Sequence, residues 1–201
     1  PLKLLRLCTA TTESFESTQA FFRWFEEETI IDGKSFKEHR QALFAEYRDF
    51  FGTDQAKIYE LEDKIKGLIA RAVRDKLYPA KLAEKINTAH AKYRESYGND
   101  VSFFVRSSGK FEDMSAADGA VGKGPASAAG QNSTVANVIG IDNVVEAFFE
   151  CVASLYNGRS MSDRFESGFN EDEAAMMVTF HRTVDSAIAG IGFTNESFSG
   201  N

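Results

Sequence analysis

The stretch from Val101 to Thr134 constrains the fold most, because it joins a short apolar run to a long segment of small residues. The run Val101–Val105 has the β-branched and aromatic composition of a buried strand. Arg106, Ser107 and Ser108 follow it directly, and a segment dominated by Gly, Ala and Ser comes next. The sequence therefore predicts a buried strand that ends in a polar, glycine-rich loop.

The composition of this loop allows two interpretations. Glycine tolerates positive φ and lets backbone N–H groups turn toward a ligand. Such amides, together with serine hydroxyls and one arginine, are the donors that a polyphosphate needs. A flexible surface loop has the same composition, so composition alone leaves both interpretations open. Neither a Walker A motif nor a dinucleotide-binding fingerprint is present, since the spacing from Gly119 to Gly124 fits neither.

Residues 1–100 show mainly helical periodicity, with apolar residues three and four positions apart. After a short strand at Leu2–Cys8, we expect an aromatic-rich helix that begins after a cap at Ser14 or Ser17 and runs to Ile31, where Asp32 and Gly33 end it. Three further helices are expected between capping residues, a proline and glycines, with the ranges Ser35–Gly52, Thr53–Tyr78 and Pro79–Gly98.

Residues 101–201 alternate between strand and helix patterns. After the glycine-rich loop we expect strands at Val135–Val138, Ala174–Phe180 and Ile188–Thr194, and helices at Asn143–Tyr156 and Ser160–Ser167. Helices followed by mixed elements predict an α+β fold. The expected organisation is a helical region at residues 1–100 and a mixed lobe at residues 101–201.

Composition narrows the possible classes of protein. A formal net charge of −7 argues against a nucleic-acid surface, and no apolar run approaches the length of a membrane span. Cys8 and Cys151 lie far apart without metal-ligand spacing, so we expect reduced thiols and a cytoplasmic or organelle-interior location. His39 and His90 also lack partners at ligand spacing, and we expect them to be surface or structural residues.

Four groups of motifs follow one another between residues 105 and 194. They are Val105–Ser108 with Glu112-Asp113, then Ala129–Gln131, then Asn137–Asp142 with Cys151–Leu155, Arg159, Arg164 and Gly168-Phe169, and finally Gly190–Thr194. In this order they resemble the V-R-S-S, E-D, A-G-Q and G-V-x-F-T motifs of the phosphoenolpyruvate synthase and pyruvate phosphate dikinase family. The resemblance implies an ATP-grasp-like domain that clamps nucleotide between two lobes. It also implies a kinase-like transferase, in which ATP phosphorylates a carrier histidine that then passes the group to an acceptor such as pyruvate.

The resemblance assigns four residues to nucleotide binding. The arginine of V-R-S-S, here Arg106, reaches the phosphates of ATP. The glycine of A-G-Q and the threonine four residues later, here Gly130 and Thr134, line the phosphate loop. His181 replaces a glutamine that contacts the nucleotide at the hinge between lobes, and an imidazole can still donate or accept a hydrogen bond.

Some of the family's machinery is expected to lie outside this chain. The chain starts at Pro1, after the family's catalytic lysine, and stops before the acidic ligands of Mg²⁺. We therefore expect neither catalytic nor metal-binding residues within it. Two hypotheses follow. The chain is part of an ATP-binding domain whose parent enzyme or larger complex supplies the rest, or it is an inactive fragment or pseudoenzyme retained as a structural linker.

Overall fold

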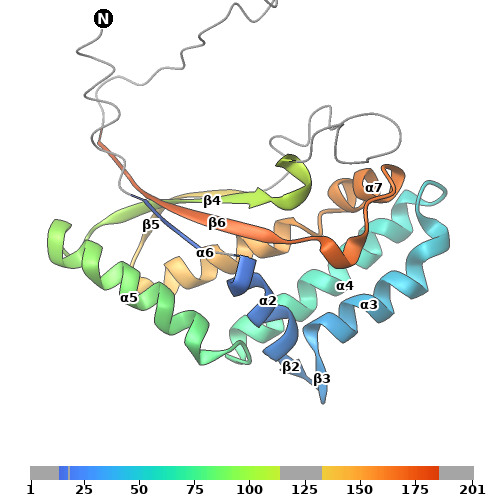
Figure 1. Ribbon diagram of the computed structural model, residues 1–201, viewed down its shortest axis with the longest axis horizontal. Coiled ribbons are helices and arrows are strands. Elements are labelled where there is room, and N and C mark those ends of the chain that lie inside the picture. The colour runs from blue at the N-terminus through green and yellow to red at the C-terminus, as the bar shows by residue number, and fades with distance from the viewer. Residues whose placement is uncertain (1–13, 18, 114–132, 186–201) are drawn as a thin grey trace, which may run out of the picture.

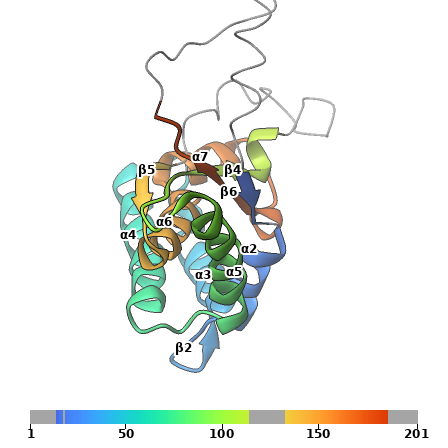
Figure 2. The same ribbon diagram turned by 90° about the vertical axis from the view of Figure 1, so that its left-hand side faces the viewer.

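A computed structural model of the protein describes residues 14–17, 19–113 and 133–185. A four-stranded sheet lies along one side of the molecule (Figure 1). Its strands, in the spatial order β1-β6-β4-β5 and each antiparallel to its neighbours, are β1 (Ser14–Glu16), β6 (Met176–Arg182), β4 (Ser102–Gly109) and β5 (Thr134–Ile139). Helices α2, α5 and α6 lie on the same side of this sheet in both ribbon views (Figures 1 and 2). The arrangement confirms the predicted α+β fold.

The helices are α2 (Gln19–Glu28), α3 (Phe36–Tyr47), α4 (Gln55–Arg74), α5 (Ala80–Tyr97), α6 (Ile141–Ser154) and α7 (Gly158–Glu166). Side-chain caps explain where two of the helices, α3 and α4, begin. The Ser35 hydroxyl accepts a hydrogen bond from the backbone N–H of Glu38, whose carboxylate accepts one from the Ser35 backbone in return. The Asp54 carboxylate caps α4 by accepting hydrogen bonds from the backbone N–H groups of Ala56 and Lys57. These caps confirm the predicted starts of the two helices.

Several predicted bounds are wrong. α3 ends at Tyr47 rather than Gly52, because a 3₁₀ turn (Arg48–Phe50) follows it. The helix predicted at Asn143–Tyr156 is α6, which begins at Ile141 and ends at Ser154. The strand predicted at Ala174–Phe180 begins at Met176 and extends to Arg182. The strands predicted at Leu2–Cys8 and Ile188–Thr194 lie outside the described residues.

The helix predicted to end at Ile31 ends at Glu28, and of its two predicted starts the one at Ser14 is wrong, whereas the one at Ser17 lies close to Gln19, where α2 begins. Residues Ser14–Glu16 form β1, because Phe15 packs face to face on Phe180 of β6, with ring centroids 4.2 Å apart. At the other end, β2 (Ile30–Ile31) and β3 (Lys34–Ser35) form a hairpin. Asp32 and Gly33 connect them with φ of 48° and 82°, the two positive values that a type I′ turn requires.

One buried core contains side chains from both the N-terminal and C-terminal halves of the chain. Phe25, Phe36, Phe149 and Tyr156 meet edge to face or tilted between the helices, with centroids 4.6 to 6.0 Å apart. Many of the chain's 18 phenylalanines therefore serve as core residues. The division into domains at residue 100 stays a prediction. No helix among the described residues is both long and apolar enough to cross a bilayer.

Candidate nucleotide-binding site

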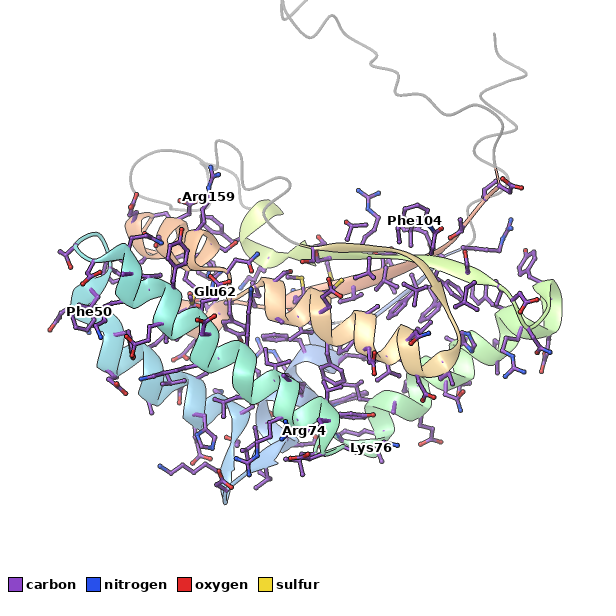
Figure 3. The ribbon with its side chains drawn as sticks, turned by 180° about the vertical axis from the view of Figure 1, so that it is seen from behind. Phe50, Glu62, Arg74, Lys76, Phe104 and Arg159 are labelled. Carbon is purple, nitrogen blue, oxygen red and sulfur yellow. The ribbon has the colours of Figure 1, made fainter. Side chains whose placement is uncertain are left out.

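Strand β4 carries the arginine that the sequence assigns to phosphate binding. Side chains alternate between the two faces of a strand, and here Phe103 and Val105 are fully buried against the helices. Phe104 and Arg106 therefore lie on the opposite face, where both are exposed. Figure 3 shows Phe104 on the side of the sheet away from the helices. We call this the open face of the sheet, as far as the described residues cover it.

The register of the sheet places two hydroxyl groups beside Arg106. Its Cα partners are Thr134 on β5 and Thr179 on β6. Directly opposed residues of neighbouring strands project from the same face with their Cβ atoms about 5 Å apart. Arg106 thus stands between two threonines, and the three side chains form one row of donors.

A second row lies two residues along the strands, where side chains again project from the open face. Phe104 is the Cα partner of His181 on β6, which is in turn the partner of Ser14 on β1. Together the two rows border a hollow of about 510 Å³, lined by Phe104, Arg106, Thr134, His181, Arg182 and Val184. The guanidinium of Arg182 lies 4.3 Å from the centroid of the Tyr97 ring at the end of α5. The hollow has Arg106 and Thr134 at one end, and Phe104 lies toward the other end beside His181 and Arg182.

Residues next to the site hold Thr134 in place. The Ser107 hydroxyl, on the helix-facing side of β4, donates a hydrogen bond of 2.7 Å to the Ser133 carbonyl. The Cys151 thiol of α6 lies 3.6 Å from the same carbonyl. Burial raises the pKa of this thiol to about 12, so it stays protonated and can donate. These contacts fix the start of β5 beside Arg106.

A β-bulge on β5 lies directly opposite Phe104. The register runs from Phe103–Val138 to Val105–Val135, so that Ala136 and Asn137 together oppose the single residue Phe104. Asn137 has φ of 56°, a left-handed conformation that asparagine tolerates better than most side chains. Bulges bend the strand and change the direction of nearby side chains. The bulge therefore shapes the edge of the hollow at Phe104.

The structure brings together three of the four residues predicted to bind nucleotide. Arg106, Thr134 and His181 line one hollow, whereas Gly130 lies outside the described residues. Four residues of this region were not predicted from the sequence to belong to the site, namely Phe104, Thr179, Arg182 and Val184. Alternation along the predicted strand could have placed Phe104 beside Arg106. Thr179 could not have been found, because its position depends on which strands pair.

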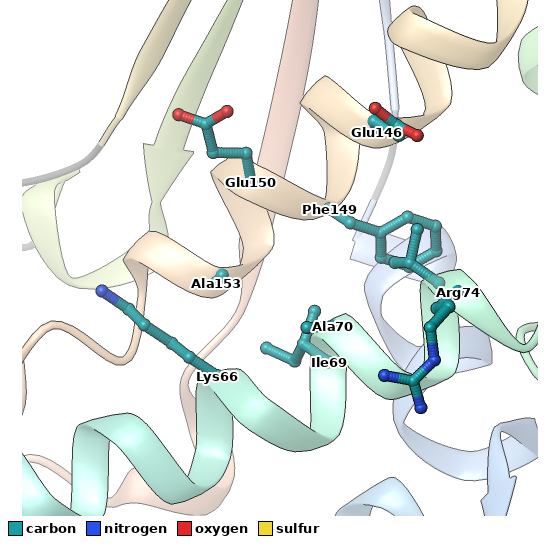
Figure 4. Close-up of a pocket in the computed structure, with 9 residues that line it drawn as sticks. Lys66, Ile69, Ala70, Arg74, Glu146, Phe149, Glu150 and Ala153 are labelled. Atoms are coloured by element: carbon teal, nitrogen blue, oxygen red, sulfur yellow. The ribbon is translucent and has the colours of Figure 1, made fainter.

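Two other hollows lie between the helices. One, of about 510 Å³, is bordered by Lys66, Ile69 and Ala70 of α4 and by Phe149 and Glu150 of α6 (Figure 4). Its Lys66 is already bonded to Glu62 at 2.6 Å and to Asn157 at 2.7 Å.

The other, of about 670 Å³, lies next to it and shares three of its residues, namely Val73, Arg74 and Glu146. It also contains the acidic side chains Glu84 and Asp142. In both hollows the carboxylates are at least as many as the cationic side chains, whereas the hollow on the open face has two arginines and no carboxylate. A polyphosphate is therefore attracted more strongly to the open face of the sheet.

Two arginines in the family-like motifs lie away from the hollow. Arg164 is 2% exposed and donates to both carboxylate oxygens of Glu171, at 2.8 and 2.7 Å, and to the Leu155 carbonyl at 2.9 Å. It therefore connects α6, α7 and the turn before β6. The side chain of Arg159 on α7 is 77% exposed (Figure 3). Within the described ranges, no group of three or more His, Cys, Asp or Glu side chains could hold a metal ion.

The known proteins that this chain resembles point to one family. Among curated proteins, the chain is 37% identical to the phosphoenolpyruvate synthase of Neisseria meningitidis over 135 residues, which is 66% of this chain and 16% of that protein. It is 29% identical to the rifampicin phosphotransferase of Bacillus subtilis over 149 residues, 74% of this chain and 16% of that protein.

A third relative, the probable phosphoenolpyruvate synthase of Archaeoglobus fulgidus, is 28% identical over 177 residues, 85% of this chain and 22% of that protein. The chain thus spans between 16% and 22% of the length of these relatives. Residues 17–201 match the family described as pyruvate phosphate dikinase, AMP/ATP-binding domain. Most of the chain is covered by this match, and the chain belongs to the family of pyruvate phosphate dikinase AMP/ATP-binding domains.

Proposed function

We propose that this chain is part of the ATP-binding domain of a phosphotransferase. In the whole protein, ATP would phosphorylate a carrier histidine, which then passes the group to an acceptor such as pyruvate. Arg106, Gly130 and Thr134 bind the phosphates, and His181 contacts the nucleotide at the hinge side of the site. The observation that carries the proposal is the pairing of Arg106 with Thr134 on the open face of the sheet, with His181 lining the same hollow.

Physical chemistry supports this assignment of roles. A guanidinium is planar and permanently charged, and it can donate two parallel hydrogen bonds to a phosphate. The hydroxyls of Thr134 and Thr179 flank it in the sheet register and can donate further bonds. The relatives bear the names of phosphoenolpyruvate synthases and a rifampicin phosphotransferase. Those names favour phosphoryl transfer over an inactive structural fragment, and they leave the acceptor open between different compounds.

Magnesium accompanies ATP in this proposal, but the described residues do not form a site for it. No suitable cluster of carboxylates or imidazoles exists in the described part of the chain. Mg²⁺ would therefore arrive bound to the triphosphate, or be held by residues outside the described ranges. When bound, it would neutralise charge on the phosphates. The contribution of Arg106 and Thr134 is to bind and orient those phosphates.

The first prediction concerns Arg106. The substitution Arg106→Ala in the full-length protein should weaken binding of MgATP by roughly tenfold or more, because it removes a charge-assisted contact to phosphate. Isothermal titration calorimetry measures the dissociation constant, and far-ultraviolet circular dichroism checks the fold. The side chain of Arg106 is exposed, so its removal should leave the folded structure intact.

The matched control is Arg159→Ala, which removes an exposed arginine outside the hollow. This variant should bind MgATP like the parent protein. If Arg106→Ala also binds like the parent, the proposed phosphate site is wrong. An unchanged phosphotransfer activity in Arg106→Ala would further favour a structural role for this part of the chain.

A further inference from the structure

We infer that Phe104 is the surface on which the base of the bound nucleotide stacks. The inference rests on the proposed function and names a residue that decides which ligands the site takes. Arg106 would hold the phosphates at one end of the hollow, and Phe104 would hold the base at the other. The ligand class is therefore a nucleoside triphosphate, bound through the flat face of its base.

The first argument is the position of Phe104 on β4. It lies two residues before Arg106, so both side chains project from the open face, about 7 Å apart along the strand. In a nucleotide, a sugar separates the base from the phosphates, so the groups that bind the two ends must be separated as well. An aromatic ring and a guanidinium at positions i and i+2 of one strand provide such a separation.

Phe104 is exposed to solvent, unlike the residues on either side of it. Phe104 is 39% exposed, whereas its neighbours Phe103 and Val105 are fully buried. Single exposed hydrophobic residues are common on protein surfaces and need no explanation by themselves. Here the exposed ring lines a hollow and has Val184, which is 37% exposed, as a second apolar wall. Such an apolar lining with a few polar groups is typical of small-molecule sites.

The third argument is the bulge on β5. Ala136 and Asn137 oppose Phe104 where a regular ladder would place one residue. The partner of Phe104 on its other side is His181. The Phe104 ring does not form a ring contact with any aromatic side chain of the described residues, although Phe103, on the other face, contacts Phe15, His90 and Tyr93. Among the described residues, no aromatic ring competes with a flat ligand for the Phe104 ring.

Stacking has a consequence for specificity. Every base has a π-face, so an aromatic platform binds adenine and guanine alike and does not read the edge of the base. Any preference between the two would come from hydrogen bonds at the base edge, for which His181 is the neighbouring side chain. Phe104 therefore contributes to the affinity for both ATP and GTP, and it contributes nothing to a ligand that lacks a base.

The test measures the dissociation constants of MgATP, MgGTP and inorganic tripolyphosphate for the full-length protein by isothermal titration calorimetry. Phe104→Leu removes the aromatic face and keeps most of the volume, while Phe104→Tyr keeps the ring. We expect Phe104→Leu to weaken MgATP and MgGTP by roughly five- to a hundredfold and to leave tripolyphosphate unchanged. Phe104→Tyr should bind all three ligands like the parent.

Two further variants separate this inference from the proposed function. Arg106→Ala should weaken all three ligands, because each carries the polyphosphate. Phe165→Leu makes the same chemical change at a Phe of α7 that is 45% exposed and lies outside the hollow, and it should change none of the three dissociation constants.

The inference is overturned if Phe104→Leu binds MgATP like the parent. It is also overturned if that variant loses tripolyphosphate to the same extent as MgATP, which would make Phe104 a packing residue. A parent protein that binds none of the ligands would overturn the proposed function itself.

Discussion

His90 is a polar residue in the hydrophobic core. It is 1% exposed on α5, and its ring lies 5.7 Å from that of Phe103 in the core. Neither ring nitrogen has a hydrogen-bond partner among the described residues. Burial, and secondarily the nearby charge of Arg94, lower the pKa of His90 from its ordinary value of 6.5. The structure thus places His90 in the core, a structural position that its sequence context predicts.

For this single residue, we predict how the free energy of unfolding changes with pH. Because the folded-state pKa of His90 is lowered, the unfolded chain binds more protons than the folded chain once the pH falls below about 6.5. The contribution of His90 to stability is therefore fully present above pH 6.5 and is lost as the pH falls through the folded-state value. His90→Phe should remove this loss and raise the free energy of unfolding by about 1 kcal/mol at neutral pH.

Urea denaturation at pH 7.5 and pH 5.5 measures both effects. The control is His39→Phe, because the ring of His39 is already hydrogen-bonded to the Ile31 carbonyl at 2.8 Å and is partly exposed. That variant should not gain stability. An equal loss of stability toward low pH in the parent and in His90→Phe would show that His90 does not cause it.

At the scale of single elements, the helices follow their sequence signals more closely than the strands do. Ser35, Asp54 and Gly98 bound helices because caps and glycine stops act over a few residues of local chain. Strand β5 has the predicted composition, but its bulge is a property of its pairing with β4. A bulge requires a partner strand, so local sequence cannot reveal it.

The bulge supports a prediction on Asn137. A β-branched residue at φ of 56° is strained, so Asn137→Val should lower the free energy of unfolding by about 1–2 kcal/mol. Asn137→Gly should be tolerated, because glycine adopts positive φ without strain. Thermal and urea denaturation compare the two variants. Equal stability of Asn137→Val and the parent protein would contradict a bulge at this position.

At the scale of the whole molecule, the open face is created by a contact between distant parts of the chain. Strand β1 completes the sheet by pairing with β6, where Phe15 opposes Phe180. The two rings stack 4.2 Å apart with planes inclined by 5°. Ser17 adds a backbone bond to the Val178 carbonyl at 2.8 Å and a side-chain bond from the Val178 N–H at 2.9 Å. These contacts hold β1 against β6 at the edge of the sheet.

The prediction at this scale is that Phe15→Ala destabilises the entire domain. Phe15 is partly buried, so the loss in free energy of unfolding should be about 2–3 kcal/mol, less than for a fully buried phenylalanine. Denaturation followed by circular dichroism measures it. Phe165→Ala, which truncates a more exposed ring, should cost less. If Phe15→Ala unfolds at the same denaturant concentration as the parent, β1 is not an integral part of the sheet.

The candidate site could be predicted in part. The motif Val105–Ser108 identified Arg106, and the family resemblance identified Thr134 and His181, all three of which line one hollow. Phe104 and Thr179 were missed, since their closeness to Arg106 depends on the face and the register of the strands. The placement of Gly130 stays a prediction.

The sequence by itself determined the family, the α+β class and the presence of the helices, because motifs, caps and periodic apolar residues act over short stretches of chain. Tertiary structure alone decided that Ser14–Glu16 is a strand, which strands pair, and which residues stand beside Arg106. The physical reason is that a strand gains its hydrogen bonds from partners far along the chain, and shifting the register by one residue exchanges its two faces.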